Sequence, residues 1–197
     1  MNSKKLLLLD FDGTITTKDT FPLFIKFDKG FVVFVSIFFL FSPFLFLYKL
    51  KLIEGGKIKL KMLSLLYKNV HQDLLIEKGI AFVNFLESED FIKPSFIKII
   101  EKGKADKTEI CIVSASPDIW ISVFAKKHAI NYICTQLSFS NNLLFDGKFE
   151  TLNCVAIEKV NRIKQQYKLT DFVEIIAYGN SQDDEEMYKI ATSFYRV

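Results

Sequence analysis

The sequence has few cysteines, and no two of them are close together. The three cysteines, Cys111, Cys134 and Cys154, stand far apart, and none belongs to a CxxC pattern. This spacing excludes a disulfide framework and a cysteine-based zinc site. Three unpaired thiols fit a protein that works in a reducing cytosol.

Neither sign of charge is in large excess. The 26 basic and 23 acidic side chains leave a net charge of +3, which is too small for a dedicated nucleic-acid binder.

A long apolar run is also missing from the start of the chain. Met1–Lys5 is short and polar, and Leu6–Leu9 is too short for a signal peptide. We therefore expect a cytoplasmic protein with no signal peptide and no nucleic-acid partner.

Internal repeats and low-complexity tails are lacking as well. Half of the residues are hydrophobic, and 21 of them are phenylalanines, so there is ample core material and disorder is excluded. A chain of 197 residues has room for one well-buried domain and a smaller appendage.

Short apolar runs that end in polar residues predict five strands, at Leu6–Asp10, Glu109–Val113, Tyr132–Gln136, Val173–Tyr178 and Ser193–Arg196. Asn141-Asn142 and Asp146-Gly147 mark the turns of a predicted β-hairpin. Helical patterns fill the gaps, at Lys57–Lys68, Asp73–Leu86, Pro94–Lys102, Pro117–His128, Val155–Tyr167 and Glu185–Ala191. Strands that alternate with helices predict an α/β fold with a doubly wound, mostly parallel sheet.

Polar side chains follow three of the predicted strands. They are Asp10 and Asp12, then Ser114 and Ser116, then Asn180, Asp183 and Asp184. Ligands bind beyond the carboxyl ends of the strands in such sheets. Carboxylates, hydroxyls and an amide are therefore expected to converge at one edge.

The segment Asp10-Phe11-Asp12-Gly13-Thr14 offers two carboxylates that can share a cation. Mg²⁺ takes hard oxygen ligands and binds through few carboxylates plus substrate phosphate. A carboxylate can also attack phosphorus and form an aspartyl-phosphate, while a second acid protonates the leaving oxygen. The alternative is an ordinary turn after a strand, because Asp and Gly favour turns.

Four motifs in order resemble those of the haloacid dehalogenase (HAD) superfamily. Asp10–Thr14 is similar to its first motif, and the strand Ile112–Ser116 to its second. Lys159 resembles the third motif, and Tyr178–Asp184 the fourth. The resemblance covers the whole chain. The helical insert after the first motif is similar to the phosphoserine-phosphatase-like branch.

The resemblance implies a Rossmann-like core with a helical cap. The core would comprise residues 1–16 and 91–197, and the cap residues 17–90. Asp10 would be the nucleophile, and Asp12 the general acid and base. Lys159 would balance the charge of phosphorylated Asp10. Phosphoryl oxygens would contact Ser114, Ala115 and Thr14, and Mg²⁺ would be held by Asp10, Asp12, Asn180 and Asp184.

Some of these residues also have plainer interpretations. Asn180 departs from the family, which usually has Asp there, so we expect weaker metal binding or a larger share of the metal for Asp184 or Asp183. Without the family match, Lys159 reads as one solvated lysine among many. Ser116 is interpreted as a cap of the helix after Pro117, and the two histidines, His71 and His128, as surface residues.

An uncharged run of 18 residues, Phe31–Tyr48, lies within the predicted cap. As a helix it would reach roughly 27 Å, at the short end of a membrane span. Lys49 and Lys51 follow at once, as in segments that bind anionic headgroups, and Pro43 leaves either one helix or two short ones. The run could be a buried or oligomeric cap helix, or it could enter the bilayer interface. A full crossing fits poorly, because the chain on both sides must return to one site.

The apolar cap and its lysines resemble phosphatidylglycerophosphatase C, a family in the same branch. The implied function is a magnesium-dependent phosphomonoesterase that acts on a lipid or amphiphilic phosphate, peripherally at the inner membrane face. Two alternatives stay open. The substrate could be a small soluble phosphate such as phosphoserine, or the chain could be a non-catalytic membrane-associated binding module, which Asn180 alone favours.

Overall fold

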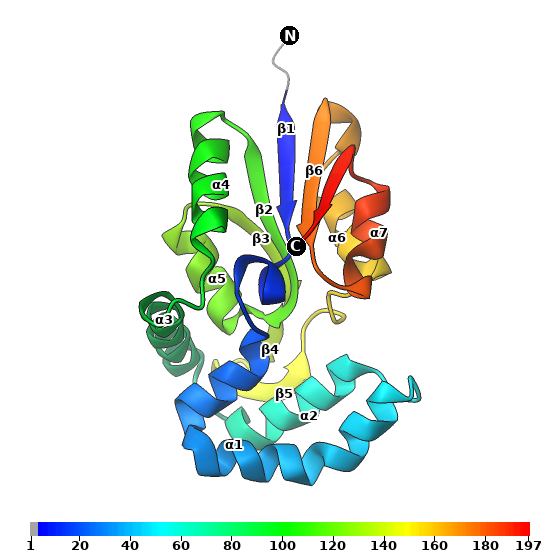
Figure 1. Cartoon of the computed structure of the whole chain (residues 1–197). Helices are drawn as coiled ribbons and strands as arrows, with labels where there is room; N and C mark the ends of the chain where they lie inside the picture. The colour runs from blue at the N-terminus through cyan, green and yellow to red at the C-terminus, as the bar shows by residue number, and fades with distance from the viewer. Residues whose placement is uncertain (1–3) are drawn as a thin grey trace.

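The computed structural model describes residues 4–197 (Figure 1). The first three residues of the polar start Met1–Lys5, and of the predicted core segment 1–16, lie outside the described residues. A five-stranded parallel sheet forms the centre, in the order β3-β2-β1-β6-β7. Its strands are β1 (Lys5–Leu9), β2 (Glu109–Pro117), β3 (Asn131–Thr135), β6 (Glu174–Gly179) and β7 (Ser193–Arg196). The five predicted strands are confirmed, and β2 runs past its expected end at Val113.

Helices cover both faces of the sheet, as the apolar character of β1 on both sides requires. Leu7 and Leu9 pack into the same core cluster as α4 (Pro94–Ala105) and α5 (Asp118–Lys127). Leu6 and Leu8 belong to the opposite cluster, with α6 (Ile157–Gln166) and α7 (Glu185–Lys189). The doubly wound, mostly parallel α/β fold is confirmed.

A second layer lies beyond the carboxyl ends of the strands (Figure 1). It contains α1 (Thr20–Lys49), α2 (Gly55–Tyr67) and a hairpin of β4 (Leu137–Phe139) and β5 (Phe145–Phe149) that packs on α2. The third helix of the predicted cap, α3 (Gln72–Ser88), packs against α5 of the core instead. The division into residues 17–90 and the rest therefore stays a prediction.

One predicted turn of the hairpin is wrong. Asn141-Asn142 lies between β4 and β5 as expected, but Asp146-Gly147 lies inside β5. The Ser138 hydroxyl donates to Asp146 at 2.9 Å across the hairpin, and Gly147 takes a φ of +84°, where the ladder between Leu137 and Phe139 is irregular. A left-handed glycine thus marks a bulge here rather than a turn.

The long helix α1 bends at Gly30 and not at Pro43. Gly30 has φ +80° and ψ 170°, whereas the backbone stays helical through Pro43. Pro43 cannot donate to the carbonyl of Phe39, and the hydroxyl of Ser42 takes that acceptor at 2.8 Å. The apolar run is therefore one helix after the bend, and not two short ones.

We expect Gly30→Ala to lower the free energy of unfolding by about 1 to 3 kcal/mol, because this backbone region is essentially restricted to glycine. No atom lies within 4 Å of a Cβ placed there, so the cost would be conformational and not a clash. Urea unfolding measures it. Ser36→Ala, at an exposed position of the same helix, is the control and should change stability by less than about 0.5 kcal/mol. Equal stability of both variants would contradict a strained bend.

By length and composition, α1 could cross a membrane, with a mean hydropathy of 2.5 over its most apolar window, of which only 11% is buried. Its outward stripe is formed by Val32, Phe39 and Phe46, seven residues apart and 77%, 80% and 62% exposed. Phe38 and Leu45, also seven apart, line a cavity on the other side. Because one face is already used inside the protein, only the other is free for a partner.

Candidate active site

The first loop after β1 turns sharply at Gly13. The Asp10 amide still donates to the Tyr178 carbonyl at 2.9 Å, and the chain then reverses over Phe11–Ile15. Gly13 has a φ of +74°, and a Cβ there would overlap the side-chain amide of Asn180. Only glycine allows the first and fourth motifs to approach this closely.

Asp10 and Lys159 form a buried ion pair at the end of β1. The Lys159 ammonium lies 2.8 Å from Asp10 Oδ1 and 2.6 Å from Asp184 Oδ1, and the Thr14 hydroxyl donates to Asp10 Oδ2 at 2.9 Å. Burial raises the pKa of Asp10 to about 6, although Lys159 opposes the shift. Lys159 is 2% exposed, so it is not the solvated lysine of the plainer interpretation.

Asp184 holds the loop after β6 in place. Its Oδ2 accepts from the Asn180 amide at 3.1 Å and from the amide and hydroxyl of Ser181 at 3.0 Å. Its Oδ1 accepts from Lys159, and its side chain is fully buried. Both carboxylate oxygens of Asp184 are thus bound within the protein. Asp184, which was predicted to help hold Mg²⁺, does not line the cavity described below.

The carboxylate of Asp12 is held from both sides. Oδ1 accepts from the Thr20 amide at 2.7 Å and from the Thr20 hydroxyl at 2.5 Å, and Trp120 in turn donates to that hydroxyl at 2.9 Å. Oδ2 accepts from the hydroxyls of Ser116 at 2.5 Å and Ser114 at 3.4 Å. These contacts fix Asp12 beside Asp10 in a single orientation.

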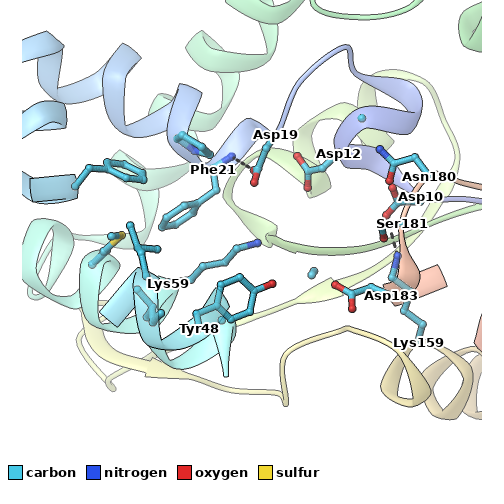
Figure 2. A pocket seen from close by; sticks show the side chains of 18 residues that line it. Asp10, Asp12, Asp19, Phe21, Tyr48, Lys59, Lys159, Asn180, Ser181 and Asp183 are labelled. Carbon is cyan, nitrogen blue, oxygen red and sulfur yellow. Dashed lines mark hydrogen bonds and ion pairs between the residues drawn. The ribbon is translucent and has the colours of Figure 1, made fainter. Parts of the chain in front are cut away.

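A cavity of about 410 Å³ lies between the sheet edge and α1 and α2. Of the predicted site residues, five line it: Asp10, Asp12, Ala115, Lys159 and Asn180. Figure 2 shows Asp10, Asp12 and Asn180 together at one end, and Phe21, Tyr48 and Lys59 toward the other. The volume and the mixed lining are those of a small-molecule site.

The other predicted site residues lie behind the residues that line the cavity. Thr14, Ser114 and Asp184 are fully buried, and their polar atoms bind Asp10, Asp12 and the loop after β6 rather than face the cavity. In the structure they position the carboxylates. Direct contact of Thr14 or Ser114 with a phosphoryl group stays a prediction.

Several residues of the site differ from the sequence interpretation or are absent from it. Ser116 binds Asp12 and does not cap α5, whose N-terminal cap residue, Pro117, makes no side-chain bond. Thr20 and Lys93, which donates to the Gly13 carbonyl at 2.7 Å, carry no motif signal. A polar side chain at the first position of an apolar helix was the available clue to Thr20.

The two histidines are not alike. His71 caps α3 by accepting from the Asp73 amide at 3.3 Å. The interpretation of His128 as a surface residue is wrong. Its side chain is only 19% exposed and packs on Phe124 with ring centroids 4.3 Å apart. Neither residue lines the cavity.

The donor set suits a hard divalent cation. Within residues 4–197, no three His, Cys, Asp or Glu side chains are placed to hold a metal by themselves. Asp10, Asp12 and Asn180 nevertheless bring carboxylate and amide oxygens to one end of the cavity. Mg²⁺ favours a site that offers few protein oxygens and leaves room for waters and a phosphate group. These three residues therefore fit Mg²⁺.

Comparisons with known proteins identify a family and relatives of the chain. A model of the haloacid dehalogenase-like hydrolase family matches residues 7–189. Protein CicA of Caulobacter vibrioides is 28% identical over 187 residues, which cover 94% of this chain and 82% of that protein.

The solved structures that share the fold include the following two. A protein with unknown function from Bordetella pertussis Tohama I has a TM-score of 0.82 at 16% identity, covering 99% of this chain and 90% of the other. A phosphoserine phosphatase, solved as a phospho-aspartyl intermediate analogue, has a TM-score of 0.67 at 19% identity, covering 99% and 87%.

Proposed function

The chain belongs to the haloacid dehalogenase-like hydrolase family, and from that premise we propose that it is a magnesium-dependent phosphomonoesterase that uses Asp10 as its nucleophile. The observation that carries the proposal is the placement of Asp10. Asp10 is 6% exposed and lines the cavity, and its carboxylate is paired with the buried Lys159. A carboxylate so fixed can attack phosphorus without first losing a full hydration shell.

In the first step, an Asp10 oxygen attacks phosphorus, and the bond from phosphorus to the leaving oxygen breaks. The carboxyl group of Asp12 supplies the proton that the leaving oxygen takes up. In the second step, Asp12 accepts a proton from water, whose oxygen attacks phosphorus. The bond to Asp10 then breaks, releasing phosphate and restoring the carboxylate.

The remaining residues hold these two aspartates. Lys159 keeps a positive charge beside Asp10 throughout, and Thr20 and Ser116 fix the orientation of Asp12. Asp10, Asp12 and Asn180 would hold Mg²⁺, which when bound offsets the repulsion between a carboxylate and a phosphate dianion. The amide of Asn180 brings no charge, so we expect weaker metal binding than with Asp.

Chelation is expected to abolish turnover. In p-nitrophenyl phosphate hydrolysis, EDTA should lower the rate at least tenfold, and excess Mg²⁺ should restore it, because a metal supplies several kcal/mol of charge stabilisation in such reactions. Turnover that survives full chelation would contradict magnesium dependence. No turnover under any condition would favour a non-catalytic binding module.

For the substrate, we propose a lipid or another amphiphilic phosphate, presented at the inner membrane face. The support is the apolar half of the cavity, to which Phe38, Leu45, Ile58 and Met62 contribute, together with the exposed stripe of α1. The resemblance to phosphatidylglycerophosphatase C points the same way. A soluble phosphate such as phosphoserine would leave these apolar walls without a contact.

The membrane part of this proposal predicts that the wild-type chain sediments with phosphatidylglycerol vesicles. Replacing Val32 and Phe39 together by Ser should weaken binding at least tenfold, since each buried apolar side chain contributes about 1.5 to 3 kcal/mol. Leu74→Ser, at an exposed apolar position of α3 (46%), is the matched control and should bind like wild type. A wild-type chain that ignores vesicles and hydrolyses phosphoserine would favour the soluble alternative.

A further inference from the structure

We infer that Lys93 is a positioning residue for the reaction, because its ammonium group fixes the peptide of Gly13 next to Asp10. The inference rests on the proposed function, which assigns the nucleophilic attack to Asp10. Lys93 lies 80 positions along the chain from Gly13, and its Nζ donates to the Gly13 carbonyl at 2.7 Å. Gly13 lines the cavity and Lys93 does not, so Lys93 acts from behind the cavity wall.

The backbone of Lys93 is fixed by its neighbours. Lys93 is the N-terminal cap residue of α4 and precedes Pro94, which restricts it to the extended backbone that it adopts. Its amide donates to the Ile15 carbonyl at 2.9 Å, and the Thr17 amide donates to the Phe91 carbonyl at 2.9 Å. These two bonds pair the end of the loop after β1 with the segment before α4. The side chain of Lys93 therefore starts from a fixed point beside that loop.

The peptide of Gly13 is held on three sides. Its amide donates to the Thr16 hydroxyl at 3.1 Å, its carbonyl accepts from Lys93, and the side chain of Asn180 fills the space into which a Cβ would project. Glycine populates many backbone conformations, so its φ of +74° has to be selected by such contacts. Lys93 supplies the charged one of the three, and hydrogen bonds from charged groups are stronger than neutral ones.

The fixed peptide carries Thr14, which binds the nucleophile. The Gly13 carbonyl belongs to the same peptide unit as the Thr14 amide, so a rotation of that unit moves Thr14. Thr14 is fully buried, and its hydroxyl donates to Asp10 Oδ2 at 2.9 Å. Without Lys93, we expect this peptide to take up other orientations and Asp10 to lose its bond to Thr14. A nucleophile misplaced by about 1 Å can slow a reaction on the order of 10²-fold.

A purely structural role of Lys93 would act through α4 instead. The ammonium of Lys93 also lies 5.9 Å from the centroid of the Phe96 ring, which α4 carries. Loss of that contact would loosen α4 and leave the loop after β1 unchanged. The two roles therefore differ in which backbone amides become less protected when the ammonium group is removed.

Removing and restoring the ammonium group tests the inference. Lys93→Cys removes it, and 2-bromoethylamine then alkylates the new thiol with loss of bromide, which restores an ammonium group at nearly the length of lysine. The three native cysteines are buried, so the reagent should react first at residue 93. Lys93→Cys should lower kcat for p-nitrophenyl phosphate about 10-fold to 100-fold, with KM within about twofold. Aminoethylation should restore most of the loss, and iodoacetamide, which adds a neutral group of similar size, should not.

Lys98→Cys is the matched control, because Lys98 is exposed on α4. Taken through the same treatments, it should keep its kcat within about twofold of wild type. A kcat that does not fall in Lys93→Cys, or that aminoethylation restores no better than iodoacetamide, would overturn the inference.

Hydrogen exchange without substrate separates the Lys93 contact from catalysis. The amides of Thr16 and Thr17 are hydrogen-bonded, so the peptide of residues 11–17 should exchange at least about tenfold faster in Lys93→Cys and slow again after aminoethylation. Exchange in α4 should not change. Faster exchange in α4 alone would show a structural role and overturn the inference. If exchange responds as expected but the wild type hydrolyses nothing, the contact holds the loop and the proposed hydrolysis fails.

Discussion

Asp10→Asn should lower kcat for p-nitrophenyl phosphate at least about 10³-fold, because loss of a nucleophile removes the covalent route altogether. An amide has the same shape as the carboxylate but cannot attack phosphorus. Its nitrogen or oxygen can still contact Thr14, and Lys159 keeps Asp184 as its counterion. The loss should therefore appear in kcat and not as unfolding. Steady-state kinetics with Mg²⁺ in excess measures it.

Two controls separate the chemistry from the fold. Asp106→Asn, at an exposed acidic position after α4, should keep its activity within twofold. The melting temperature of Asp10→Asn should stay close to that of wild type, since burial already raises the pKa of Asp10 to about 6 and a neutral group is not costly there. Asp10→Asn with wild-type turnover would exclude Asp10 as the nucleophile.

Lys159→Met should destabilise the protein by about 3 to 5 kcal/mol at neutral pH, because it leaves two buried carboxylates without their counterion. Asp10 is 6% exposed and Asp184 is fully buried, so water cannot replace the ammonium group. Activity should fall at the same time, because Asp10 would no longer be held as an anion. Urea unfolding and p-nitrophenyl phosphate turnover measure the two effects.

The deficit should shrink in acid. Burial and the repulsion of Asp184 raise the folded-state pKa of Asp10, and Lys159 opposes them, so removing Lys159 should raise that pKa further above the unfolded value. Over that pH range the folded variant binds more protons than the unfolded chain, so its stability falls as the pH rises through the folded-state pKa of Asp10. Lys164→Met, at an exposed position of the same helix, should change stability by less than about 0.5 kcal/mol at any pH. A Lys159→Met protein as stable as wild type at pH 7 would contradict the buried ion-pair network.

The core of the fold was predictable because its signals are local. Each strand is a short apolar run that ends in a polar residue, and β1 carries Leu6–Leu9 because both of its faces are buried. The parallel sheet then brings Asp10, Asp12 and Asn180 to one edge without further information. Asp146-Gly147 shows the limit, since a left-handed glycine suits a turn and a bulge equally well.

The supporting contacts of the site were not predictable in the same way. Thr20 and Ser116 meet at Asp12 although 96 residues separate them, and no local pattern encodes such a meeting. Lys59 is one of many lysines in its segment, and only packing decides which of them faces the cavity. For α1, the sequence left the bend at Pro43 open, because it did not reveal that Ser42 would take the free carbonyl of Phe39.

Trapping of the covalent intermediate gives the most direct measurement. Wild-type protein turning over a phosphomonoester with Mg²⁺ is quenched and treated with borohydride, which reduces an acyl-phosphate to an alcohol, and the peptide containing residue 10 is analysed by mass spectrometry. We predict the mass of homoserine at position 10, and an unchanged mass when substrate is omitted. Active protein whose Asp10 stays unmodified, or whose label appears at another carboxylate, would contradict nucleophilic attack by Asp10.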